Sequence, residues 1–87
     1  MRARAEVFVQ LKPGMLDPQG ETLTHALEGM GYESIDGMRV GKWITFRLEG
    51  SDKEEISARV DEMCRRLLAN PVIERYRFVI SDDESGG

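Results

Sequence analysis

Few side chains in this sequence are of the types that carry out chemistry, and none has a partner at a useful spacing. Cys64 is the single cysteine, and one thiol forms neither an intrachain disulfide nor a structural zinc site. Its neighbours Met63, Leu67 and Leu68 predict a buried thiol in apolar packing and not a nucleophile. His25, the single histidine, falls off the apolar stripe of its predicted helix, so we expect a solvated side chain. The sequence therefore predicts no catalytic, metal-binding or cofactor-binding residue.

The turn Lys12-Pro13-Gly14 precedes a predicted helix start, which is where phosphate-binding loops occur. The Walker pattern does not follow it. Asp17 and Glu21 would also place negative charge where an anion would have to bind. A structural turn is therefore the better interpretation.

Composition indicates one small globular domain. The chain has 87 residues, 40% of them hydrophobic, and a formal net charge of −4. Phosphate neutralisation supplies most of the affinity of nucleic-acid binders, so an acidic balance argues against that class. The lone cysteine, the lack of an apolar signal-like N-terminus and the lack of a long apolar run lead us to expect a cytoplasmic protein.

Alternating apolar residues predict four strands. They cover residues 4–11, 35–40, 43–49 and 74–80. The second strand is weakened by Asp36-Gly37, and Gly41-Lys42 is predicted to be a tight hairpin turn between the second and third strands.

Helical spacing predicts two helices between these strands. The first begins at Pro18 after an Asp17 cap and ends before a left-handed Gly31. Its apolar stripe contains Leu23, Ala26, Leu27 and Met30. The second begins with a capping box of Ser51 and Glu54 and ends at Asn70-Pro71. Its predicted inner face is Ile56, Val60, Met63, Cys64, Leu67 and Leu68.

The resulting β-α-β-β-α-β order predicts an α+β ferredoxin-like sandwich. We expect a four-stranded antiparallel sheet with both helices on one face. The domain would span residues 1–80, and residues 81–87 would form a disordered acidic tail.

The other face of the sheet would stay open. It carries Phe8, Trp43 and Val79 among arginines. Base stacking on such aromatics is a property of single-stranded RNA readers, but the signature of that fold is missing and the chain is acidic. An exposed apolar patch is more typical of a protein interface, so we expect a homo-oligomer, a dimer or a dimer of dimers, that self-associates through Phe8, Trp43 and Val79.

Three segments resemble the PurS family, the small subunit of phosphoribosylformylglycinamidine synthase. They are residues 11–20, 39–42 and 63–74, and the likeness is collinear from about residue 7 to residue 80. The strings Leu-Asp-Pro-Gln-Gly at 16–20 and Asn-Pro-Val-Ile-Glu at 70–74 are highly specific when they occur together.

This resemblance implies a non-catalytic assembly subunit. Such a chain bridges a large synthetase subunit and a glutaminase subunit and supports ammonia transfer between them. The complex, an ATP-dependent glutamine amidotransferase, makes formylglycinamidine ribonucleotide in the fourth step of de novo purine synthesis. ATP, magnesium and glutamine would be used by the partner subunits. This chain itself would bind no cofactor, no nucleic acid and no membrane.

The resemblance also suggests which residues contact the partners. They are Leu16, Asp17, Gln19, Gly20, Arg39, Gly41 and Lys42. An ordinary helix cap, a turn and solvated charges are the competing interpretations.

Two other functions fit the same element order. A small-molecule sensor of the ACT type would bind an amino acid near Pro13-Gly14 at a dimer interface. An acylphosphatase-like enzyme would need an arginine-bearing phosphate loop, which this sequence lacks.

Overall fold

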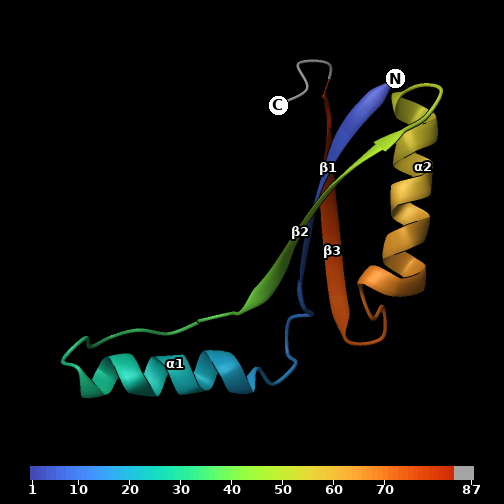
Figure 1. Ribbon diagram of the computed structural model, residues 1–87. Coiled ribbons are helices and arrows are strands. Elements are labelled where there is room, and N and C mark those ends of the chain that lie inside the picture. Colours follow the sequence, from blue (N-terminus) through green and yellow to red (C-terminus); the bar gives the residue numbers. More distant parts are fainter. Residues whose placement is uncertain (84–87) are drawn as a thin grey trace.

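The computed structural model describes residues 1–83 and shows an α+β fold (Figure 1). Three antiparallel strands form a sheet in the order β2-β1-β3, so the first strand of the chain is the central one. The elements in chain order are β1 (Arg2–Leu11), α1 (Pro18–Gly29), β2 (Gly41–Glu49), α2 (Lys53–Met63), the π-helical turn η1 (Cys64–Leu68) and β3 (Glu74–Asp82).

The core lies between one face of the sheet and α2. Successive strand residues point to opposite faces, and in β1 the inward set Ala3, Ala5, Val7 and Val9 is almost fully buried. From the other side, Ile56 and Val60 of α2 and Cys64 of η1 pack against these residues. The predicted alternation of β1 and the buried thiol are confirmed. We call the side of the sheet that α2 covers the inner face, and the opposite side the outer face.

The prediction of a four-stranded sheet is wrong for the described residues. Residues 35–40 form no strand, and Gly41 and Lys42 belong to β2 instead of a turn. Ser34 and Gly37 have φ values of 65° and 69°, which interrupt an extended run. The Val40 amide donates to the Asp17 carboxylate and so has no need of a strand partner.

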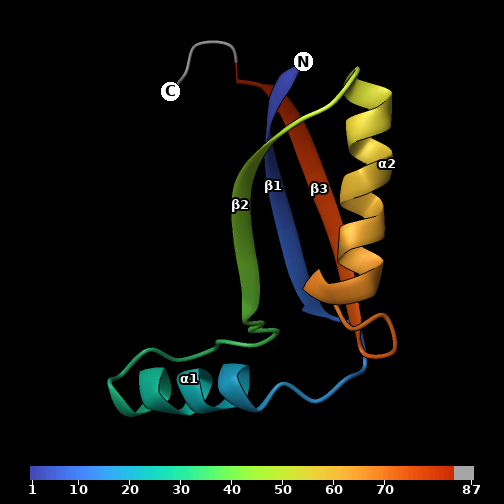
Figure 2. The ribbon, with the colours of Figure 1, turned by 45° about the vertical axis from the view of Figure 1, so that its right-hand side comes forward.

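The first helix does not lie on the sheet, which is a second correction. Figures 1 and 2 show α2 alongside the strands, whereas α1 extends away below the end where β2 begins. Gly20 is the only buried residue of α1, and Leu23 and Met30 of its apolar stripe are 47% and 70% exposed. The Asp17 cap, Pro18 and the left-handed Gly31 are as predicted.

The overall dimensions reflect this projecting helix. The radius of gyration is 16.8 Å, whereas a compact domain of this length has about 12 Å. The accessible surface is 6163 Å², against about 5200 Å² for a typical monomer of this mass. A single copy of the chain therefore exposes more surface than a stable small domain usually does.

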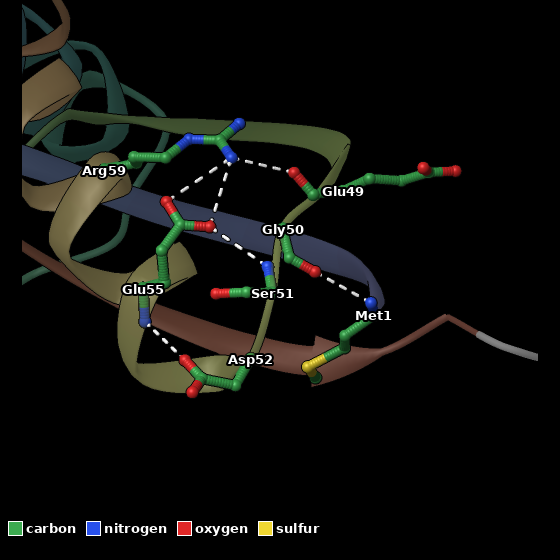
Figure 3. Close-up of polar contacts among 7 residues, drawn as sticks. All are labelled: Met1, Glu49, Gly50, Ser51, Asp52, Glu55 and Arg59. Atoms are coloured by element: carbon green, nitrogen blue, oxygen red, sulfur yellow. Dashed lines mark hydrogen bonds and ion pairs between the residues drawn. The ribbon is translucent and has the colours of Figure 1, made fainter.

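The start of α2 is fixed by a hydrogen-bonded cluster (Figure 3). The N-cap is Asp52, whose carboxylate accepts from the Glu55 amide at 2.9 Å, and the Glu55 carboxylate accepts from the Ser51 amide at 3.2 Å. The predicted box of Ser51 and Glu54 was therefore one residue too early. Arg59 also donates to the Glu49 carbonyl at 2.8 Å, which joins the end of β2 to the helix.

The helical segment that begins with α2 ends in a π-helical turn, which is wider than the α-helix predicted there. The Ala69 amide donates to the Cys64 carbonyl at 2.9 Å, a bond across five residues that defines a π-helical turn. The wider turn rotates the following side chains, and Leu67 is 83% exposed although its spacing placed it on the inner face.

The last strand continues beyond its predicted end at Ile80. Asp82 pairs with Ala3, and the Asp83 carboxylate lies 3.0 Å from Nε of Arg47. Of the predicted acidic tail, residues 84–87 lie outside the described part of the chain. Within residues 1–83 no helix has the length and apolar content needed to cross a membrane.

Candidate functional site

Residues far apart in the sequence converge where α1 joins the sheet. One Asp17 oxygen accepts from the Gly20 amide at 2.9 Å and the other accepts from the Val40 amide at 2.9 Å. Arg39 donates to the Met15 carbonyl at 2.8 Å. We call residues 15–20 together with 38–40 the α1 root. The structure thus brings together Leu16, Asp17, Gln19, Gly20 and Arg39, five of the predicted contact residues.

The Asp17 side chain holds this root together electrostatically. It is 9% exposed, and the pKa of its carboxyl is lowered, chiefly by the hydrogen bond from the Gly20 amide and then by the one from Val40. Arg39 adds a smaller Coulomb effect in the same direction. Asp17 therefore ties the start of α1 to the strand entry as a carboxylate, a structural role beyond the predicted helix cap.

Gly20 is required at this point because the chain passes very close to it. A Cβ atom at Gly20 would lie 2.6 Å from the Met38 carbonyl oxygen, which is backbone, and 3.1 Å from Oδ2 of Asp17. Real Cβ atoms do not approach that closely. The segment at 38–40 therefore runs directly over the first turn of α1.

The two remaining predicted contact residues, Gly41 and Lys42, lie next to the root. With Gln19 of the root and with Glu74 they line a surface cleft of about 240 Å³. Lys42 is not simply a solvated charge, because its Nζ donates to the Leu68 carbonyl at the end of η1 at 3.3 Å. Leu16, by contrast, is 72% exposed and is available for a contact.

An apolar groove between α2 and β2 was not predicted. It has a volume of about 510 Å³ and is lined by the apolar side chains Phe46, Met63, Leu67 and Leu68, with Arg59, Glu62 and Arg66 at its rim. The sequence placed α1 over this part of the sheet. Leu67 belongs to the π-helical turn η1 and lines the groove, and the apolar spacing did not reveal that turn.

The outer face carries the three residues predicted to mediate self-association. The rings of Phe8 and Trp43 stack across neighbouring strands, with centroids 6.5 Å apart and planes at 9°. Trp43 and Val79 are 63% and 46% exposed. This confirms the position of the patch, whereas its role in self-association stays a prediction.

The groups with catalytic potential are poorly placed for catalysis. Cys64 is fully buried, and burial, with a smaller contribution from Asp61, raises the pKa of its thiol, so the reactive thiolate is disfavoured. His25 is exposed on α1. Within residues 1–83 no group of three or more His, Cys, Asp or Glu side chains is arranged to hold a metal ion.

Known proteins resemble this chain along most of its length. The family model described as PurS, phosphoribosylformylglycinamidine (FGAM) synthase, matches residues 4–82. The chain is 42% identical to the phosphoribosylformylglycinamidine synthase subunit PurS of Bacillus subtilis, over 91% of this chain and 93% of the relative. It is 37% identical to the subunit of the same name from Methanocaldococcus jannaschii, over 93% and 98%.

Solved structures agree with this relationship. The B. subtilis PurS structure has a TM-score of 0.83 at 41% identity, over 92% of this chain and 99% of that one. A chain in the structure of PurLQS from Thermotoga maritima has a TM-score of 0.84 at 30% identity, over 93% and 99%. Sequence and fold therefore agree along nearly the whole chain, and this chain belongs to the PurS family of phosphoribosylformylglycinamidine synthase subunits.

Proposed function

We propose that this chain is the non-catalytic assembly subunit of a phosphoribosylformylglycinamidine synthase complex. It bridges the synthetase and glutaminase subunits and keeps ammonia from escaping between their active sites. The observation that carries the proposal is the likeness, over 93% of this chain, to a chain in the PurLQS structure. The fully buried Cys64 supports it, because a glutaminase reaction needs an accessible thiolate.

The proposal assigns the chemistry to the partners. ATP, magnesium and glutamine are used there, and this chain contributes a rigid, water-excluding junction. The substrate is formylglycinamide ribonucleotide and the product its amidine, in the fourth step of purine synthesis, in the cytoplasm.

The α1 root and the adjoining residues Gly41 and Lys42 are the proposed contact with a partner subunit. Leu16 is the best residue for a test because its side chain is 72% exposed. Leu16→Asp should weaken complex assembly, whereas Val72→Asp, at an equally exposed residue beyond η1, should not. Equal retention of both variants by an immobilised synthetase and glutaminase mixture would exclude the root as a contact.

We propose that self-association occurs through α1, in place of the predicted contact through Phe8, Trp43 and Val79. The exposed stripe of α1, including Leu23 and Met30, and the apolar groove at Phe46 and Leu68 are each too apolar to be left in water at no cost. In a two-fold dimer each copy would place α1 in the groove of the other, a closed and reciprocal arrangement. Each sheet would then be covered on one face by two helices, as predicted for a ferredoxin-like sandwich, with α2 from its own chain and α1 from the other.

Light scattering tests this dimer. Leu23→Glu should shift the mass toward that of a monomer, because it places a charge in the apolar contact. The neighbouring exposed change Thr22→Glu adds the same charge outside the stripe and should leave the mass unaltered. An unaltered mass for Leu23→Glu would rule out this contact.

Reconstitution tests the function itself. The synthetase and glutaminase subunits are assayed for glutamine-dependent amidine formation with and without this chain, and ammonia serves as the control nitrogen source. We expect glutamine-dependent turnover to require the chain and ammonia-dependent turnover to require it much less. If neither rate nor the mass of the complex changes, the bridging role is wrong.

A further inference from the structure

The outer face concentrates positive charge on an acidic chain. Its strand positions and the adjoining Asp83 hold five arginines and three carboxylates, a net charge of +2. Since the whole chain carries −4, the rest of it carries −6. The arginines are Arg2, Arg4, Arg47, Arg75 and Arg77, and the carboxylates are Glu6, Glu49 and Asp83.

Three of these arginines have no acidic partner among residues 1–83. Arg77 lies over the Phe8 ring, 4.1 Å from its centroid, and Arg75 donates twice to the neutral Gln10, at 2.8 and 3.3 Å. Arg4 makes no ion pair within that range. The arginines of α2 and η1 differ, because each pairs with a carboxylate four residues earlier. Acidic residues are thus available in this chain, yet the outer face is left with excess positive charge.

The aromatic residues of the face are held in a fixed arrangement. Phe8 pairs in register with Trp43 on one side and Arg77 on the other, so one row of side chains crosses all three strands. Trp43 is further fixed by a hydrogen bond from Nε1 to the Glu6 carboxylate at 3.1 Å. Around this row lies a depression of about 530 Å³. Trp and Arg fixed in this way are the residue types that dominate protein interfaces.

One cross-strand pair shows that this charge is costly without a partner. Arg4 and Arg47 lie directly opposite each other on β1 and β2, and like charges at such positions are destabilising. The Asp83 carboxylate offsets the positive charge of Arg47 through an ion pair at 3.0 Å. A carboxylate from outside the chain would relieve the remaining repulsion at Arg4.

The charge of the outer face also favours one kind of binding partner over others. Two outer faces stacked on each other would bring their unpaired arginines together, which disfavours a second copy. A polynucleotide would be repelled by the net charge of −4 and by the Glu6 carboxylate beside the tryptophan. An acidic protein surface meets neither obstacle.

We propose that the outer face docks an acidic protein surface on one of the partner subunits of the synthase complex. Arg75 and Arg77 are two residues apart on β3, so they would receive two carboxylates spaced about 7 Å apart. Apolar side chains of the partner would cover Trp43. This proposal rests on the proposed function, and it places a second contact on the side of the sheet opposite α2.

Charge reversal tests the proposal. The full-length chain with Arg75→Glu and Arg77→Glu is titrated against the synthetase and glutaminase subunits. We expect binding about tenfold to a hundredfold weaker and a shallower salt dependence. The control carries Lys53→Glu on α2 and Arg65→Glu on η1, which make the same charge change away from the outer face, and should bind as the unaltered chain does. If the reversed variant unfolds, Arg75→Gln with Arg77→Gln replaces it, and about a tenfold loss is expected.

A second measurement needs no substitution. The chain has one tryptophan, so 5-fluorotryptophan gives a single ¹⁹F signal that reports on Trp43. This signal should shift when the unlabelled partner subunits are added, and it should not shift with a single-stranded oligonucleotide.

Each other outcome overturns the proposal. Unweakened binding of the reversed variant shows that the partners do not use this face. A lower self-association mass for that variant assigns the face to a second copy, and a ¹⁹F shift with the oligonucleotide assigns it to nucleic acid. If the unaltered chain fails to bind the partners at all, the proposed function itself falls, and the docking proposal falls with it.

Discussion

Two glycines of the same helix should respond to alanine in opposite ways. Gly20 and Gly29 both lie in α1, and alanine is favoured over glycine in a helix by up to about 1 kcal/mol. A Cβ at Gly29 would meet nothing within 4 Å, so Gly29→Ala should stabilise α1. A Cβ at Gly20 would lie 2.6 Å from the Met38 carbonyl, so Gly20→Ala must displace the backbone.

The free-energy cost of Gly20→Ala follows from that displacement. Ordinary contact between carbon and another heavy atom begins near 3.5 Å, so the Met38 carbonyl must move by about 0.9 Å. Val40 lies two residues away, and its 2.9 Å bond to Asp17 would be strained or lost. Such overpacking costs about 1–3 kcal/mol. Because the propensity gain is similar in both variants, their difference in α1 stability should be about 1–3 kcal/mol.

Hydrogen exchange of the α1 amides measures this difference directly. A gap of 1–3 kcal/mol corresponds to protection about 5- to 150-fold lower in Gly20→Ala than in Gly29→Ala. Global melting is less informative, because α1 buries little against the sheet in one copy. Equal protection in both variants would show that residues 38–40 do not cover the helix start, and the account of the α1 root would be wrong.

Three further predictions concern Asp17, Cys64 and the core. The pKa of the Asp17 carboxyl is lower in the folded chain than in the unfolded chain, so its contribution to the stability of the root should be complete above about pH 4 and lost as the pH falls through the folded pKa. The protection of the α1 amides from hydrogen exchange, measured from about pH 2.5 to 5, should therefore depend less on pH in Asp17→Asn than in the unaltered chain. The Cys64 thiol, buried and with a raised pKa, should resist iodoacetamide at neutral pH and react only in denaturant; modification of the native chain would contradict this. Ile56→Ala should lower the free energy of unfolding by about 2–5 kcal/mol, because Ile56 is fully buried, whereas Val72→Ala at an exposed residue should change it by less than about 0.5 kcal/mol.

Local patterns predicted the elements that depend on local physics. The alternation in β1 identified its buried set, with Val7 and Val9 among the most buried side chains. Asp17, Pro18 and Gly31 marked the limits of α1 correctly. Capping was predicted one residue early at α2, because Ser51 and Asp52 are both competent caps and only the bond to the Glu55 amide distinguishes them.

The candidate site was partly predictable for a different reason. The strings at 16–20 and 70–74 indicated the family, and the resemblance of residues 11–20 and 39–42 indicated the candidate contact residues. They did not indicate that Asp17 binds the Val40 amide or that Lys42 binds the Leu68 carbonyl, because these contacts join residues 23 and 26 positions apart. Periodicity carries no information on such pairs.

The sequence by itself determined the family and the α+β class. These follow from residue type and from spacing over a few turns. Only the tertiary structure decided where the helices lie. Residues 35–40 form no strand, with positive φ at Ser34 and Gly37 and the Val40 amide bound to Asp17. The first helix lies away from the sheet with its stripe exposed. Its apolar spacing specifies that one face should be buried, but not which chain covers it, because that depends on contacts between surfaces that lie far apart in sequence.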